Sequence, residues 1–210
     1  MKPKPTYSVT LDWREDEVYE FLSSLRDGLG HFPVPVHISV ANFLKLADDG
    51  LAHLKEFLRK VSQTHSVHEV VFGIGMMKAN RPVFGEDIVA IPVVLAGELK
   101  NIWDVFKDNG IVSRHPPHVT ITIGDLARDR DLGLHDYVRE SLLHWKSRRG
   151  VMKARGVGLE LWQHKAGKRQ LMERFPLAKE CFCRICIRAK RLEAHGCSCT
   201  ICFRALRSAK

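Results

Sequence analysis

The chain has 210 residues, of which 45% are hydrophobic and 27% are charged, as in an ordinary globular protein that is long enough to form one core. Its longest apolar run, IVAIPVVLAG, is too short to cross a membrane, and its first residues, MKPKPTYSV, lead into no apolar segment. We therefore exclude a membrane-spanning protein, and we expect an intracellular protein with no signal peptide and no membrane partner. The formal net charge is +9.

The predicted elements alternate between strands and helices along the chain. Apolar patterns predict strands at 7–11, 34–40, 68–77, 87–95 and 118–123, and helices at 15–30, 44–63, 96–108 and 136–147. A hairpin across Ala166 and Gly167 follows, with strands at 154–165 and 169–177. Strands mixed with helices and hairpins favour an α+β fold over a doubly wound parallel sheet.

Two of the predicted strands carry the same three-residue pattern. In HPPHVTITIG, His118 and Thr120 lie on one face of the strand and apolar residues on the other, because side chains alternate along a strand. In VPVHISV, His37 and Ser39 repeat the pattern, again after a proline. Either pattern alone is typical of a half-buried strand. If the two strands are neighbours in one sheet, however, two imidazoles and two hydroxyls converge.

Such a group of side chains suits the cleavage of a phosphodiester bond. One imidazole takes a proton from the attacking hydroxyl or water, and the other gives a proton to the leaving oxygen. The hydroxyls donate hydrogen bonds to the phosphate oxygens, where charge gathers in the transition state. The competing interpretation is that both histidines are satisfied residues of the core.

On these two motifs the chain resembles the two-histidine (2H) phosphoesterases over roughly residues 7–178. The resemblance implies a two-lobed α+β fold with antiparallel sheets that line a central cleft. It implies a phosphodiesterase, either a hydrolase or an RNA-transesterifying lyase, with His37 and His118 as the catalytic pair. Ser39 and Thr120 would hold the substrate phosphate. Proton transfer by two imidazoles needs no metal, so we expect no catalytic cofactor.

The motifs leave the substrate linkage open. The family's branches act on 2′,5′-oligoadenylate, on 2′,3′-cyclic phosphates and on the 3′ ends of RNA, and this chain has features of more than one branch. The partner expected from any of them is RNA or an oligonucleotide, bound by a monomer. Charge agrees with this expectation, because residues 141–210 carry 17 Lys and Arg against 4 Asp and Glu, whereas residues 1–140 carry 16 against 20.

The cysteines define a second segment. All six lie between 181 and 202, in CFCRIC and CSCTIC, so we divide the chain into a catalytic domain at 1–178 and a basic, Cys-rich tail at 179–210. The paired C-x-x-C elements predict a structural zinc site formed by Cys183, Cys186, Cys199 and Cys202. The other interpretations are a redox-active or lipid-modified cysteine cluster, or an unstructured tail. The alternative for the whole chain is a non-catalytic module that binds RNA or protein through this zinc-stabilised tail.

Overall fold

The structure is a computed structural model of the chain. It describes residues 5–29, 34–46, 49–75, 77–81, 86–111, 115–123, 133–165 and 167–178. The predicted tail, with Cys183, Cys186, Cys199 and Cys202, lies outside the described residues.

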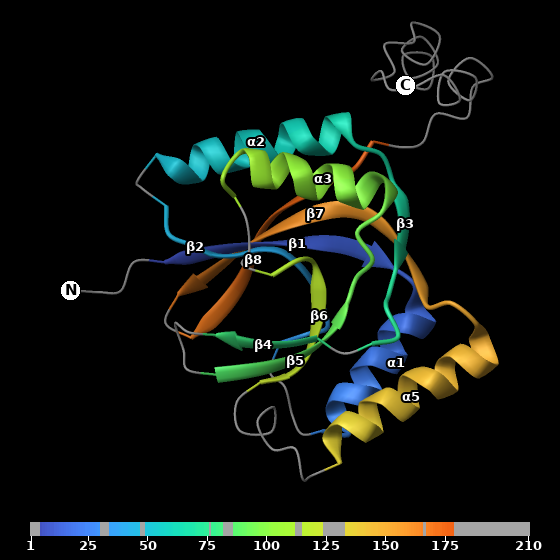
Figure 1. Cartoon of the computed structure of the whole chain (residues 1–210). Coiled ribbons are helices and arrows are strands. Elements are labelled where there is room, and N and C mark those ends of the chain that lie inside the picture. The colour runs from blue at the N-terminus through green and yellow to red at the C-terminus, as the bar shows by residue number, and fades with distance from the viewer. Residues whose placement is uncertain are drawn as a thin grey trace, which may run out of the picture.

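Strands and helices follow one another much as the sequence predicts (Figure 1). The strands are β1 (Thr6–Arg14), β2 (Ile38–Leu44), β3 (His68–Val71), β4 (Met77–Arg81), β5 (Glu86–Pro92), β6 (His118–Ile123), β7 (Lys153–Lys165) and β8 (Lys168–Pro176). The helices are α1 (Asp16–Asp27), α2 (Gly50–Thr64), α3 (Gly97–Asp108) and α5 (Leu134–Arg149).

The boundaries of two predicted strands are wrong. β2 begins at Ile38 rather than at 34, because prolines at 33 and 35 have no N–H to donate to a neighbouring strand. The strand expected at 68–77 ends at Val71, and a separate strand, β4, begins at Met77. Gly73 lies at this break. A Cβ atom there would come within 2.9 Å of the Pro92 side chain, so the close approach of the two segments requires glycine.

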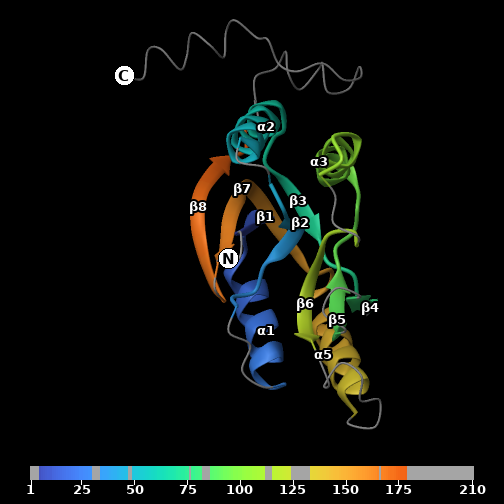
Figure 2. The ribbon, with the colours of Figure 1, turned by 90° about the vertical axis from the view of Figure 1, so that its left-hand side faces the viewer.

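All the strands pair antiparallel in one sheet, in the order β3-β7-β1-β2-β6-β5-β4, with β8 beside β7. The expected α+β fold with antiparallel strands is therefore confirmed, and the described strands form one continuous sheet. The sheet has two halves, since β2 and β6 pair only through Ile38 with Val119 and Ser39 with His118. In Figure 2, β8, β7 and β1 lie on one side of this narrow connection and β6, β5 and β4 on the other.

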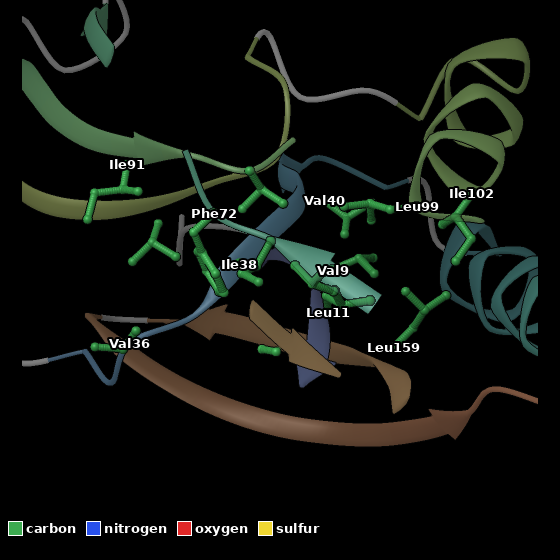
Figure 3. Close-up of a cluster of buried hydrophobic side chains, with 14 of the residues drawn as sticks. Val9, Leu11, Val36, Ile38, Val40, Phe72, Ile91, Leu99, Ile102 and Leu159 are labelled. Atoms are coloured by element: carbon green, nitrogen blue, oxygen red, sulfur yellow. The ribbon is translucent and has the colours of Figure 1, made fainter. Parts of the chain in front are cut away.

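The hydrophobic core lies between the apolar side of the sheet and the helices. Val9, Leu11, Ile38 and Val40 alternate with polar residues along β1 and β2 and are buried (Figure 3). The helices contribute residues spaced three or four apart, which share one helical face: Leu54, Leu58 and Val61 from α2, and Leu99, Ile102 and Phe106 from α3. The polar residues between the core positions therefore face the other side of the sheet. Within the described residues, no helix combines the length and the apolar character needed to cross a membrane.

Candidate active site

A row of polar residues crosses the middle of the sheet. Thr10 of β1 pairs with Ser39 of β2, and Ser39 pairs with His118 of β6. Residues that pair directly across neighbouring strands point to the same face, so these three side chains lie side by side. All are buried, with 0%, 3% and 3% of their surface exposed. Thr120 follows two positions after His118 on the same face and is 8% exposed.

The two predicted catalytic histidines are held in the same way. Nδ1 of His37 lies 2.8 Å from the carbonyl oxygen of Pro35, and Nδ1 of His118 lies 2.7 Å from the carbonyl oxygen of Pro116. Because a carbonyl only accepts hydrogen bonds, Nδ1 must donate in both rings. The neutral imidazole then has its acceptor lone pair on Nε2. Each ring is thus fixed in one tautomer by the residue two positions before it.

The surroundings of His37 keep its ring neutral. Burial and then the nearby Arg169 guanidinium lower the pKa of His37 to about 3, against the opposing effect of the Pro35 carbonyl. His118 is close enough to add a small effect in the same direction. A neutral imidazole whose Nε2 accepts a proton is the form that a general base requires.

Arg169 is a neighbour of this site that sequence reasoning missed. It lies on β8, and its Nη1 atom is 3.4 Å from Nδ1 of His37. Its guanidinium lies 4.1 Å above the ring of Trp162, which is on β7. The sequence indicates only an arginine near a hairpin turn. Its contact with His37 joins residues 132 positions apart, and no local pattern encodes a contact of that length.

Next to Arg169, β1 and β7 share a hydrogen-bond network that the sequence also does not reveal. Nε1 of Trp162 donates to Oγ1 of Thr10 at 3.0 Å and to Oε2 of Glu160 at 3.2 Å, and Thr10 donates to the same Glu160 oxygen at 3.2 Å. Farther along, Nε2 of His164 lies 2.8 Å from Oγ of Ser8. The alternation of Glu160, Trp162 and His164 along β7 indicates a polar face, but only the pairing with β1 places that face beside the histidines.

The four predicted site residues therefore lie on, or directly before, two adjacent strands. His37 and Ser39 come from the start of β2, and His118 and Thr120 from the start of β6. No described residues form a group of three or more His, Cys, Asp or Glu side chains that could hold a metal ion.

Comparison with known proteins gives structural matches but no sequence matches. No protein-family model and no curated protein sequence matches the chain. Escherichia coli LigT in complex with 3′-AMP matches with a TM-score of 0.53 at 10% identity, over 84% of this chain and 99% of LigT. The protein TT0787 of Thermus thermophilus matches with a TM-score of 0.52 at 12% identity, over 86% of this chain and 100% of that one.

Kluyveromyces marxianus Usb1 with uridine monophosphate is also similar, with a TM-score of 0.47 at 15% identity, over 82% of this chain and 98% of that one. The likeness to LigT and TT0787, with TM-scores above 0.5, is the stronger one. It establishes the fold, which is the α+β fold of the two-histidine phosphoesterases.

Proposed function

We propose that this chain, which has the fold of E. coli LigT, is a two-histidine phosphoesterase that cleaves RNA-type phosphodiester bonds. One observation carries the proposal. Two His-x-Ser/Thr motifs meet through the Ser39–His118 pair, and each histidine is held through Nδ1 by the carbonyl of a proline two residues earlier. Satisfied core histidines would not require the same anchor, the same tautomer and a hydroxyl neighbour at both positions.

The two imidazoles divide the proton transfers between them. His37, whose pKa is lowered to about 3, takes the proton of the attacking hydroxyl or water on Nε2 as the new O–P bond forms. His118 donates a proton to the leaving oxygen as its bond to phosphorus breaks. The protein thus gains one proton at His37 and loses one at His118.

The hydroxyls of Ser39 and Thr120 stabilise the phosphate between the two rings. Both belong to the polar row at the β2–β6 connection, and each lies two residues after a catalytic histidine. Hydrogen bonds to the non-bridging oxygens become stronger as charge gathers there in the transition state. No step of this scheme uses a metal ion, so we propose that catalysis is metal-independent.

The proposed substrate is RNA or an oligonucleotide. LigT has been seen with 3′-AMP, and it is this fold that the present chain shares. The excess of Lys and Arg in residues 141–210 would attract a polyanion. Three linkages fit this description, namely those of 2′,5′-oligoadenylate, of 2′,3′-cyclic phosphates and of RNA 3′ ends, and the protein would act as a monomer.

The test is a cleavage assay of the full chain on these three substrates in the presence of EDTA. We expect turnover of at least one of them, with the products identified by mass spectrometry. Activity that EDTA abolishes and magnesium restores would contradict the metal-independent scheme. Binding of all three without any cleavage would instead support the non-catalytic module.

The zinc site of the tail remains a separate proposal from the sequence. If Cys183, Cys186, Cys199 and Cys202 bind zinc, the purified chain should contain about one equivalent of it. Elemental analysis measures this directly. Protein purified under reducing conditions that lacks zinc and takes up none would contradict the proposal.

A further inference from the structure

Arg169 is held next to the catalytic base but is not satisfied there. The arginine lies on β8, one residue after Lys168, where the closing hairpin turns back. Its Nη1 atom approaches Nδ1 of His37 to 3.4 Å. That nitrogen already donates its hydrogen to the carbonyl of Pro35, so it has no lone pair to offer. The contact brings the two side chains together without supplying the arginine with an acceptor.

Among the described residues, the other two nitrogens of this guanidinium also have no acceptor. Nε and Nη2 are buried, and within the described part of the chain neither has a hydrogen-bond partner. No described carboxylate forms an ion pair with Arg169. The negative charge of Glu160 acts on Arg169 and raises its pKa, but the Glu160 oxygens accept hydrogen bonds from Thr10, Trp162 and Arg174. Burial lowers the pKa of Arg169 to about 10, which still leaves the group charged at neutral pH.

A guanidinium whose buried nitrogens lack acceptors destabilises the ligand-free protein. Buried donors without acceptors and buried charges without counter-ions both destabilise the folded state. The Trp162 ring, whose centre lies 4.1 Å from the guanidinium carbon, offsets part of this through cation–π attraction. What the arrangement lacks is an anion with several acceptor oxygens.

We propose that Arg169 binds a phosphate group of the substrate beside His37, as a third phosphate-binding side chain in addition to Ser39 and Thr120. A phosphate presents several oxygens in the geometry that a guanidinium fork matches with two parallel hydrogen bonds. The inference rests on the proposed function, because it takes the ligand of this site to be a phosphate ester.

A carboxylate ligand could accept the same two hydrogen bonds, but the position of Arg169 in the site favours a phosphate. The guanidinium touches the ring that the proposed reaction uses as a base, and the hydroxyls of the same polar face are hydrogen-bond donors. A purely structural role is also a poor fit, because a structural arginine of this burial would have its nitrogens paired with protein oxygens.

The test compares Arg169→Gln, Arg169→Lys and the matched control Lys168→Gln in the full chain. Lys168→Gln removes the same charge from the neighbouring, exposed position of the same strand. The probes are 3′-AMP and inorganic phosphate, and adenosine serves as the ligand that lacks phosphate. Calorimetry or NMR titration measures the affinity for each probe.

We expect Arg169→Gln to weaken the binding of 3′-AMP by about 10- to 100-fold, since a charge-assisted hydrogen bond contributes at that level. The affinity for inorganic phosphate should fall in the same way, and the affinity for adenosine should not change. The affinity of Arg169→Lys for 3′-AMP should lie between those of the unchanged protein and Arg169→Gln, because lysine keeps the charge but lacks the forked pair of donors. Lys168→Gln should change the affinity for 3′-AMP by less than about twofold. The melting temperature of ligand-free Arg169→Gln should not fall, because an unpaired buried charge has been removed.

The outcomes separate this inference from the proposed function. Affinity for 3′-AMP that does not change in Arg169→Gln, or that falls equally for adenosine, overturns the inference. If His37 and His118 still prove essential for cleavage, the proposed function survives that result. Conversely, Arg169-dependent binding of 3′-AMP by a protein that cleaves none of the three substrates supports the inference and overturns the phosphodiesterase.

Discussion

The two histidine motifs look alike in sequence and are held alike, but they have different neighbours. His37 lies just before β2, is half-buried, and has the Arg169 guanidinium against its ring. His118 is the first residue of β6, pairs with Ser39, and is 3% exposed. The closing hairpin thus brings a positive charge to the ring of His37. Two copies of one motif can therefore provide histidines that differ in pKa, because the pKa of each imidazole depends on side chains outside the motif.

The largest expected effect is the loss of either imidazole. His37→Ala and His118→Ala should each lower kcat/KM by about 10²- to 10⁴-fold, which is the usual contribution of a positioned acid or base. Both variants should keep the fold, as judged by circular dichroism. His144→Ala, an exposed position on α5, is the control and should keep full activity. Near-normal activity of either site variant would remove that histidine from the mechanism.

A substrate with an activated leaving group should separate the two roles. A nucleoside 3′-(4-nitrophenyl phosphate) releases an oxygen that needs no proton, so it makes the general acid dispensable but not the base. We expect it to rescue His118→Ala by at least about tenfold relative to an ordinary substrate, and not to rescue His37→Ala. Initial rates give the answer. Rescue of His37→Ala alone would show that the roles are the reverse of those proposed.

The pH dependence of catalysis should reveal the charge beside His37. Burial and Arg169 lower the pKa of His37 to about 3, so the acidic limb of kcat/KM should lie well below the ordinary histidine value of 6.5. Arg169→Gln removes the second cause and should move this limb to higher pH, whereas Lys168→Gln should leave it in place. Rate profiles that extend from about pH 2.5 to about pH 9 cover this limb and measure the shift. An acidic limb that does not move would mean that Arg169 does not act on the base.

The smallest expected effect is on stability in acid. The folded pKa of His37 lies below the unfolded value of 6.5, so between about 3 and 6.5 the unfolded chain binds the proton more readily. The free energy of unfolding should therefore decrease as the pH falls through this window. His37→Gln should make the decrease shallower, as measured by urea unfolding at several pH values. An equally steep decrease in the variant would place its cause at other groups.

The sequence predicted most of the elements because their patterns are local. Leu54, Leu58 and Val61 mark one face of α2 through their spacing, and alternation marks the polar and apolar faces of β2 and β6. One of the errors occurred where the chain meets a distant partner. At the break in the strand predicted at 68–77, Gly73 lies against Pro92 of β5, and nothing near Gly73 in the sequence indicates that contact.

For the candidate site, the sequence by itself determined the four motif residues and their faces. Side-chain alternation puts His37 with Ser39 and His118 with Thr120 whatever the strands pair with. Only the tertiary structure decided that the two motifs meet, through the Ser39–His118 pair. It also decided that Arg169 lies against one imidazole, across 132 positions of the chain. The physical reason is that strand periodicity is a property of the local backbone. Register, burial and charge at an imidazole arise from segments that are distant in sequence and come together only on folding.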